Sequence, residues 1–392
     1  MAFHRSAPTI KSLLLSAGEA SGDNYGAQLI ESFHQLSPDT ASFGMGGEKM
    51  QAAGCELLVH AKEVAVVGLV EVLTHLPDIR RKFRRLVEEA KRRRPAAAVL
   101  IDFPDFNLRL ARELHQLSIP VFYFVSPQVW AWRSGRVKQI QKYVRKMIVI
   151  FPFEQDFYKA HGVEVSYVGH PLAYAPEAVV SREEFAAKYS LDATKQWIAL
   201  LPGSRPKEVR MNLPAMLTAA GQLGSAYEYI LPIASTLDRS WLQQQLSAAP
   251  VPVKITENAL ITVKHARAAV VASGTATVET ALAGTPFVVV YRLAPLTWLL
   301  GRRLVRLDTF AMPNLIAGRR IVTELIQHDF TPENIVSELK AILPDGSRRA
   351  QMIHDLKEVR ERLRDETGTE SPAMRAAQEI LQLTAKRAKN LS

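Results

Sequence analysis

Short apolar runs alternate with longer amphipathic stretches through most of this chain, and this alternation limits the fold more than any other feature. The runs have the length of strands and are rich in valine, isoleucine and leucine. They lie at residues 13–15, 96–101, 121–125, 147–150, 198–201, 229–232, 268–272 and 286–290. Strands that alternate with helices form β-α-β units, which build parallel sheets covered by helices on both faces. The sequence therefore predicts an α/β protein.

The pattern of strands and helices restarts near residue 172, which predicts two doubly wound, Rossmann-like domains. A proline-bearing stretch at 171–176 precedes a new helix at about 182–189. A chain of 392 residues suits two domains better than one. Ligands of such sheets bind outside the carboxyl ends of the strands, so we expect the site in a cleft between two facing domains. We expect an N-terminal domain at 1–172, a second domain at 173–350 and C-terminal helices at 351–392.

The composition limits the partners and the compartment. The net charge of +10 favours polyanionic partners, such as nucleic acid, anionic lipid or phosphorylated substrates. Cys55 is the one cysteine, so no intrachain disulfide can form, which is typical of a reducing compartment. The N-terminus lacks the long apolar run of a signal peptide, and no stretch reaches the roughly 18 apolar residues that span a bilayer. We expect a cytoplasmic protein that is soluble or bound at a membrane surface.

Two carboxylates follow the strand at 97–101, in the segment Asp-Phe-Pro-Asp-Phe-Asn at 102–107. An aspartate beside Phe103 and Pro104 would be partly desolvated, which raises its pKa and suits a general base. Either aspartate could instead cap the helix that follows. We interpret Asp102 as the base and Asp105 as the cap.

A loop of small residues, Ser-Ala-Gly-Glu-Ala-Ser-Gly-Asp at 16–23, follows the first strand. Small residues let the backbone approach a ligand closely, but they also form ordinary tight turns between a strand and a helix. Ser21 or Asp23 could cap that helix. The residues alone leave both interpretations open.

Two further turns of small residues each open a helix in the second domain. Gly203, Ser204 and Arg205 follow the strand at 198–201. Free backbone N–H groups and the positive end of a helix suit an anion, and the arginine adds a fixed fork for phosphate oxygens. The alternative is an ordinary turn with a surface arginine.

The second of these turns, Ser-Gly-Thr at 273–275, follows the strand at 268–272. Glu279 comes four residues after Thr275, so the two side chains can share a helix face. A glutamate one turn into this helix suits a sugar diol, such as a nucleotide ribose. It could also be a surface residue near the helix start. The sequence holds no Cys/His cluster, no HExxH and no DxD pair, so we predict no metal site.

Residues 64–76 are unusually apolar and are followed by a basic stretch. The apolar side chains include Val64, Val66, Val67, Leu69, Val70, Leu73 and Leu76, and the basic ones include Arg80, Arg81, Lys82, Arg84 and Arg85. Apolar surface beside a basic patch fits docking on an anionic membrane or binding of acyl chains. The alternative is a core helix followed by a solvated helix.

Taken together, these motifs resemble the bacterial lipid-A-disaccharide synthase family of inverting glycosyltransferases. The matching segments run in family order at 16–23, 63–73, 101–107, 125–133, 151–158, 168–170, 200–205, 272–279 and 312–319. The resemblance implies a glycosyltransferase-B fold and a hexosyltransferase of lipid A, and hence lipopolysaccharide, biosynthesis. It implies UDP-2,3-diacylglucosamine as donor, 2,3-diacylglucosamine 1-phosphate as acceptor, and a β-1,6-linked disaccharide 1-phosphate and UDP as products. It also implies peripheral binding to the inner face of the inner membrane.

The resemblance also implies roles for single residues, and no cofactor. Asp102 matches the base that takes the proton of the acceptor's 6-hydroxyl, and Arg205, with Ser204 beside it, matches the position at the UDP diphosphate. The other implied substrate-binding residues are Ser273, Gly274, Thr275, Glu279 and Asn314 on the donor side and Glu19, Ser21 and Asp23 at the border of the cleft. Phe103 and Pro206 depart from the small residues that the family tends to have.

Two other functions remain as alternatives. A UDP-N-acetylglucosamine 2-epimerase or another sugar transferase would share the fold, but residues 64–76 favour a lipid substrate. A basic nucleic-acid-binding protein fits the charge, although the basic residues are not interleaved with aromatic ones as in single-strand binders. The sequence leaves open whether the C-terminal helices fold back on the first domain or, in a homodimer, onto a partner chain.

Overall fold

The computed structural model describes residues 10–64, 69–132, 134–175, 179–292, 309–364 and 369–391. These residues form two compact units. The first comprises the chain up to Tyr174 together with the residues from Asp365 onward, and the second comprises Ala175–Arg364. None of the described helices is long and apolar enough to cross a membrane.

The first unit is built on a parallel sheet with the strand order β3-β2-β1-β4-β5-β6-β7. Its strands are β1 Ser12–Ala17, β2 Ala41–Gly46, β3 Cys55–His60, β4 Ala97–Ile101, β5 Val121–Phe124, β6 Lys146–Val149 and β7 Val165–Tyr167. Its helices are α1 Ala20–Leu36, α2 Glu48–Ala52, α3 Leu69–Arg93, α4 Pro104–Gln116, α5 Val129–Trp132, α6 Val137–Tyr143, α7 Pro152–Ala160 and α17 Pro372–Leu391. Short 3-10 turns lie at Ala61–Glu63, Ser134–Arg136 and Pro171–Ala173.

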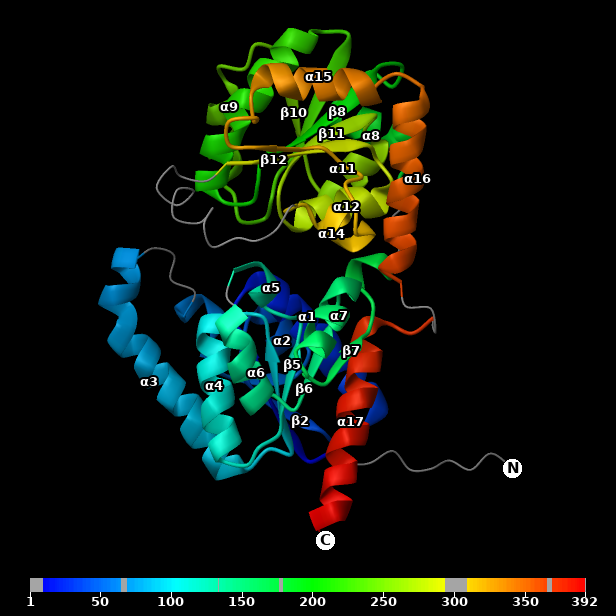
Figure 1. The fold of residues 1–392 in the computed structure, drawn as a ribbon. Coiled ribbons are helices and arrows are strands. Elements are labelled where there is room, and N and C mark those ends of the chain that lie inside the picture. The colour runs from blue at the N-terminus through cyan, green and yellow to red at the C-terminus, as the bar shows by residue number, and fades with distance from the viewer. Residues whose placement is uncertain are drawn as a thin grey trace. The chain divides into compact units, whose positions relative to one another are not determined.

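Alternate residues of these strands enter two hydrophobic cores, one on each face of the sheet. Leu14 packs with side chains of α3, α4 and α6, whereas Leu13 and Leu15 pack with those of α1 and α17. Figure 1 shows α3, α4 and α6 together on one side of this sheet. Side chains point to opposite faces at successive strand positions, so a strand covered on both faces is apolar throughout. The burial on both faces explains the continuous apolar runs of the sequence.

The second unit repeats the arrangement with the strand order β10-β9-β8-β11-β12-β13. Its strands are β8 Gln196–Leu201, β9 Tyr227–Pro232, β10 Val253–Thr256, β11 Ala268–Ala272, β12 Phe287–Tyr291 and β13 Glu324–Ile326. Its helices are α8 Arg182–Tyr189, α9 Pro206–Leu223, α10 Arg239–Leu246, α11 Ala259–His265, α12 Thr275–Ala283, α14 Met312–Ala317, α15 Pro332–Ile342 and α16 Ser347–Arg362. Helices α9 and α15 pack together, and so do α12, α14 and α16 (Figure 1). The predicted Rossmann-like sheets are present in both units.

The C-terminal helices do not form the separate segment expected at 351–392. Helix α16 packs on α12 and α14 of the second unit, whereas α17 packs on α1 of the first unit in the same chain. Ala376, Ala377, Ile380 and Leu381 of α17 enter the core on the α1 face of the first sheet. The chain therefore crosses between the units near residue 174 and again near residue 365, and the first of these positions lies two residues from the expected boundary.

Candidate functional site

Asp102 lies directly after β4, at the carboxyl edge of the first sheet. Its backbone is left-handed, with φ of 45°, and so is that of Phe103, with φ of 49°. The side chain is largely buried, and this burial is the main reason why its pKa is raised from 3.8 to about 6. The negative charge of Glu19 raises it further. A carboxyl group with this pKa is ionised at pH 7 and binds a proton far more readily than an ordinary aspartate, which suits a general base.

Asp105 is not the helix cap that the sequence suggested. Helix α4 begins at Pro104, and its N-cap residue is Phe103, which provides no side-chain cap. Asp105 lies in the first helical turn and forms an ion pair with Arg136. A carboxylate in this position is still favourable, because the first turn carries the positive end of the helix.

Phe103 packs against the loop at the end of β1. A Cβ atom added to Gly18 would lie 2.3 Å from the Phe103 ring, so only glycine fits there. The same ring lies 5.8 Å from that of Phe106. Phe103, which replaces a small residue of the resembled family, therefore closes one side of the loop that holds Glu19 and Ser21. Both of these side chains are exposed.

Asp23 has a structural role that the sequence did not indicate. Neither it nor Ser21 caps α1, whose N-cap residue is Glu19 without a side-chain cap. The buried Asp23 carboxylate instead accepts hydrogen bonds from the backbone N–H groups of Gly47 at 2.7 Å, Lys49 at 3.1 Å and Met50 at 3.1 Å. Both oxygens are therefore used to hold the start of α2, which is a structural role beside the substrate contact that the resemblance implies.

A further buried carboxyl group, that of Glu154, is affected by the charge of Asp102, and no sequence pattern indicated it. Glu154 of α7 accepts hydrogen bonds from the Trp130 indole at 3.2 Å and from the backbone N–H of Phe151 at 3.3 Å. Burial raises its pKa from 4.5 to about 8, and the charge of Asp102 contributes. A glutamate in the first turn of an aromatic-rich helix resembles an ordinary surface residue in sequence, so only its burial marks it.

In the second unit, the turn after β8 already binds a carboxylate side chain of the protein, that of Glu208. The carboxylate of Glu208 accepts hydrogen bonds from the backbone N–H groups of Ser204 at 3.0 Å and Arg205 at 3.3 Å. Its other oxygen lies 3.2 Å from the exposed Arg205 guanidinium. The turn thus binds a carboxylate with the groups that we expected to bind phosphate. A diphosphate there would have to take the place of Glu208.

The turn after β11 lies beside the turn after β8, because the two strands pair directly, with Val271 opposite Leu201. Gly274 and Thr275 are exposed at the start of α12. Glu279 lies one turn further, is largely buried, and has its pKa raised by burial. Among the described residues its carboxylate has no hydrogen-bond or ion-pair partner, so it is available to accept hydrogen bonds from a ligand.

Asn314 is completely buried, and its amide group is fully used within the protein. Its nitrogen donates to the Val322 carbonyl at 3.0 Å and to Glu324 at 2.7 Å, while its oxygen accepts from the N–H groups of Ile321 at 2.8 Å and Val322 at 3.0 Å. An asparagine amide has two hydrogens and two acceptor positions. The Asn314 side chain therefore holds the segment before β13 in place. Its amide has no hydrogen or acceptor position left for the expected contact with the donor.

Comparison with known proteins decides among the candidate functions. The family model described as lipid-A-disaccharide synthetase matches residues 13–380. The lipid-A-disaccharide synthase of Koribacter versatilis is 56% identical over 96% of this chain and 99% of its own length. That of Acidobacterium capsulatum is 50% identical over 91% of this chain and 92% of its own length. The chain belongs to the lipid-A-disaccharide synthase family. It is thus a glycosyltransferase of lipid A biosynthesis.

Solved structures similar to this family member show its fold. The glycosyltransferase of kitacinnamycin superposes with a TM-score of 0.64 and 14% identity, covering 96% of this chain and 99% of its own. A UDP-N-acetylglucosamine 2-epimerase from Neisseria meningitidis gives 0.55 and 11%, covering 96% and 100%. At such low identity the likeness concerns the fold alone, which is the glycosyltransferase-B arrangement of two Rossmann-like units. The epimerase alternative therefore rests on shared architecture, whereas the family match favours the synthase.

The apolar segment at 64–76 lies mostly outside the described residues or side chains. This applies to Val66 and Val67 and to the side chains of Leu69, Val70, Leu73 and Leu76. Val64 is described and is buried in the core on the α3 face, so it is not an exposed membrane contact. The basic part of α3 is exposed at Arg80, Arg81, Arg84 and Arg85. Arg81 also forms an ion pair with Asp78, and the less exposed Lys82 is ion-paired with Glu63 at 2.9 Å.

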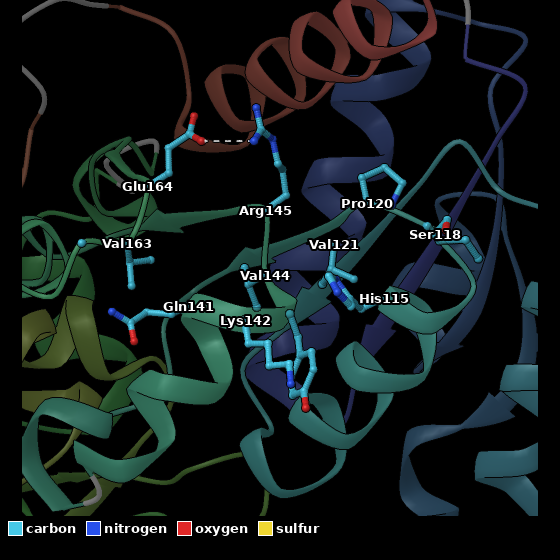
Figure 2. Close-up of a pocket in the computed structure, with 13 residues that line it drawn as sticks. His115, Ser118, Pro120, Val121, Gln141, Lys142, Val144, Arg145, Val163 and Glu164 are labelled. Atoms are coloured by element: carbon cyan, nitrogen blue, oxygen red, sulfur yellow. Dashed lines mark ion pairs between the residues drawn. The ribbon is translucent and has the colours of Figure 1, made fainter. Parts of the chain in front are cut away.

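A hollow of about 520 Å³ lies at the amino ends of β5, β6 and β7, the opposite edge of the sheet from Asp102. Figure 2 shows His115, Lys142, Arg145 and Glu164 among its lining residues, with Arg145 and Glu164 ion-paired at 3.8 Å. Ligands of doubly wound sheets bind at the carboxyl ends of the strands. We therefore place the candidate site at the strand ends that carry Asp102, and not in this hollow.

Proposed function

We propose that this enzyme transfers 2,3-diacylglucosamine from UDP-2,3-diacylglucosamine to the 6-hydroxyl of 2,3-diacylglucosamine 1-phosphate. The products are the β-1,6-linked disaccharide 1-phosphate and UDP. The observation that carries this proposal is Asp102, a largely buried carboxyl group with a pKa of about 6 at the carboxyl end of a central strand. Such a group is deprotonated at neutral pH and still basic enough to accept the proton of a hydroxyl group as it attacks.

The reaction is a single inverting displacement. The acceptor oxygen attacks the anomeric carbon from the face opposite the diphosphate, and Asp102 takes its proton. The bond between the anomeric carbon and the diphosphate oxygen breaks, and UDP leaves with the electron pair. Negative charge grows on that oxygen, and donors that are already in place stabilise it better than mobile water does. We assign this role to Arg205 and to the backbone N–H groups of the turn at Ser204, once the diphosphate has displaced Glu208.

Glu279 binds the donor in this scheme. Its carboxylate is free of partners among the described residues and lies one helical turn beyond the exposed turn at Ser273, Gly274 and Thr275. A carboxylate can accept one hydrogen bond from each hydroxyl of a ribose diol. Glu19 and Ser21, exposed on the loop that borders Asp102, are assigned to the acceptor side. Asn314 contributes indirectly, because it holds the segment before β13 in place.

We also propose that α3 holds the enzyme at the inner face of the inner membrane. The exposed guanidinium groups of Arg80, Arg81, Arg84 and Arg85 support this, because each basic residue near an anionic surface contributes about 1 kcal/mol. Sedimentation with vesicles of anionic lipid tests it. A variant with Arg84 and Arg85 both replaced by glutamine should bind less, and equal binding to zwitterionic vesicles would contradict the electrostatic role.

The experiment that tests the reaction is UDP release by the purified enzyme in detergent. The donor is supplied with and without 2,3-diacylglucosamine 1-phosphate, in the absence of added metal. We expect release that requires the acceptor, together with a disaccharide product. Release without acceptor and without disaccharide would instead indicate hydrolysis or epimerisation, and no release in either case would reject the proposed substrates.

A further inference from the structure

Two adjacent strands of the first sheet end in strained backbone at the candidate site. After β4, Asp102 and Phe103 are left-handed, and after β5, Val125 is left-handed with φ of 62°. Aspartate tolerates this region better than most residues, but it is unfavourable for a bulky residue such as Phe103 and most of all for a β-branched residue such as Val125. The two strained positions are joined, because the N–H of Asp102 donates to the Val125 carbonyl at 3.3 Å. Strain of this kind persists only where the surroundings hold it in place, and it is concentrated at functional sites.

Two buried side chains hold this backbone by the same atom. The carbonyl oxygen of Asp102 accepts a hydrogen bond from the Tyr123 hydroxyl at 2.5 Å and another from the Asn107 amide at 2.8 Å. Tyr123 belongs to β5 and Asn107 to α4, so the carbonyl is fixed from two elements. Asn107 is itself fixed, since its oxygen accepts from the Ser16 hydroxyl at 2.7 Å at the end of β1.

The two hydrogen bonds from Tyr123 and Asn107 to the Asp102 carbonyl, here called the clamp, have the chemistry of a permanent contact. Tyr123 and Asn107 are completely buried, so no water competes for their hydrogen bonds. Burial raises the pKa of Tyr123 well above its usual value, so its hydroxyl keeps its proton and donates at every pH at which the protein works. Tyr123 stands in the otherwise apolar strand Val-Phe-Tyr-Phe, where phenylalanine would fill the same space. The hydroxyl is the one part of the side chain that the core does not require.

We infer that Tyr123 and Asn107 are positioning residues for catalysis: they hold the backbone of Asp102 in the strained conformation from which its carboxyl group acts. This inference rests on the proposed role of Asp102 as the base. Misplacement of a reacting group by about 1 Å can cost about 100-fold in rate. Loss of the clamp should therefore lower turnover while the substrate-binding groups remain where they are.

Tyr123→Phe is the sharpest test, because it removes one oxygen atom. We expect kcat to fall by about 10-fold to 100-fold, with KM for both substrates changed by less than about 3-fold. The acid limb of the kcat/KM–pH profile, set by Asp102 near pH 6, should move to lower pH as the released carboxyl group becomes better solvated. Asn107→Asp, which keeps an acceptor for Ser16 but loses the amide donor, should also lower kcat. Its added carboxyl group would raise the pKa of Asp102, so the shift of the acid limb is tested with Tyr123→Phe alone.

The matched control is Tyr229→Phe. Tyr229 is also a buried strand tyrosine, and its hydroxyl donates to the carbonyls of Ala220 and Gly224, both at 2.9 Å, in the second unit. Both variants lose a buried hydrogen bond of the same kind, so their melting temperatures should fall by similar amounts. Only Tyr123→Phe should change kcat and the pH profile. A Tyr123→Phe enzyme with the kcat and acid limb of the Tyr229→Phe enzyme would overturn the inference.

The inference and the proposed function fail in different ways. If Asp102→Asn retains normal turnover, Asp102 is not the base, and the role of the clamp falls with it. If Asp102→Asn is inactive and Tyr123→Phe is fully active, the base stands and the clamp is only a structural feature. If the wild-type enzyme releases no UDP from the proposed substrates, the substrate assignment fails before either variant is compared.

Discussion

Replacing Asp102 by asparagine should make the protein inactive and, above about pH 6, more stable. The reason is that the fold holds the Asp102 carboxylate at a cost. Burial and the charge of Glu19 raise its pKa from 3.8 to about 6. Each pKa unit corresponds to 1.36 kcal/mol, so a shift of about 2 units means that the ionised side chain lowers the free energy of unfolding by about 3 kcal/mol. Asparagine fills nearly the same volume without the charge.

The pH dependence distinguishes this effect from a change of packing. The folded state binds the proton of Asp102 more tightly than the unfolded state. The stability that this proton contributes is fully present below pH 3.8, and it is lost as the pH rises through about 6. The wild-type protein should therefore lose about 3 kcal/mol relative to the asparagine variant across this window, and the difference should be constant at higher pH.

The assay is urea unfolding of both proteins from about pH 4 to about pH 8, with turnover measured on the same samples. We expect the variant to gain stability relative to wild type as the pH rises, and to lose roughly 100-fold or more in kcat, the scale of general-base catalysis. A stability difference that is the same at every pH would refute the reasoning, because it would show that Asp102 ionises as readily in the folded protein as in water.

Three further substitutions separate binding from stability. Glu279→Ala should raise KM for the UDP-sugar about 10-fold to 100-fold, the scale of lost hydrogen bonds to a charged group, with little change in melting temperature; steady-state kinetics and UDP titration check this. Gly18→Ala should destabilise the protein by about 1–3 kcal/mol, because its Cβ would meet the Phe103 ring at 2.3 Å, and urea unfolding should show partial rescue by Phe103→Ala. Asn314→Ala should lower stability by about 1–3 kcal/mol, because it leaves buried polar groups without partners, and should lower the melting temperature more than it alters KM.

The central strands of both sheets were readable from the sequence because they are buried on both faces. β4, with Ala-Ala-Val-Leu-Ile, and β11, with Ala-Ala-Val-Val-Ala, are apolar at every position. The sequence did not reveal several strands. β2 pairs with a strand on each side but contains two glycines and a serine, whereas the edge strands β7 and β13 have three residues each, with polar side chains among them. A strand that is short, or that is rich in glycine, carries no continuous apolar signal, so only its pairing defines it.

The sequence predicted the site residues that lie at strand ends, but it did not predict the roles that depend on tertiary contacts. The turns that carry Asp102, Arg205 and Glu279 all follow apolar runs, and the rule for ligand sites in parallel sheets points to them. The roles of Asp23 and Asn314 depend on backbone N–H groups elsewhere in the fold, which a sequence pattern does not contain. For the same reason, the tie between Tyr123 and the Asp102 carbonyl could not be foreseen.

Two carboxyl groups of the first unit, those of Asp102 and Glu154, differ in charge at pH 7 because burial raises their pKa values to different extents. The pKa of Asp102 is about 6 and that of Glu154 is about 8, so at neutral pH the first is charged and the second is protonated. If Glu154 were also ionised, its charge would repel that of Asp102 and raise the pKa of Asp102 further. Surroundings that separate the pKa values of two like groups can keep one as a base and the other neutral. The deeper burial of Glu154 keeps it protonated at neutral pH, so it adds no negative charge to that of Asp102.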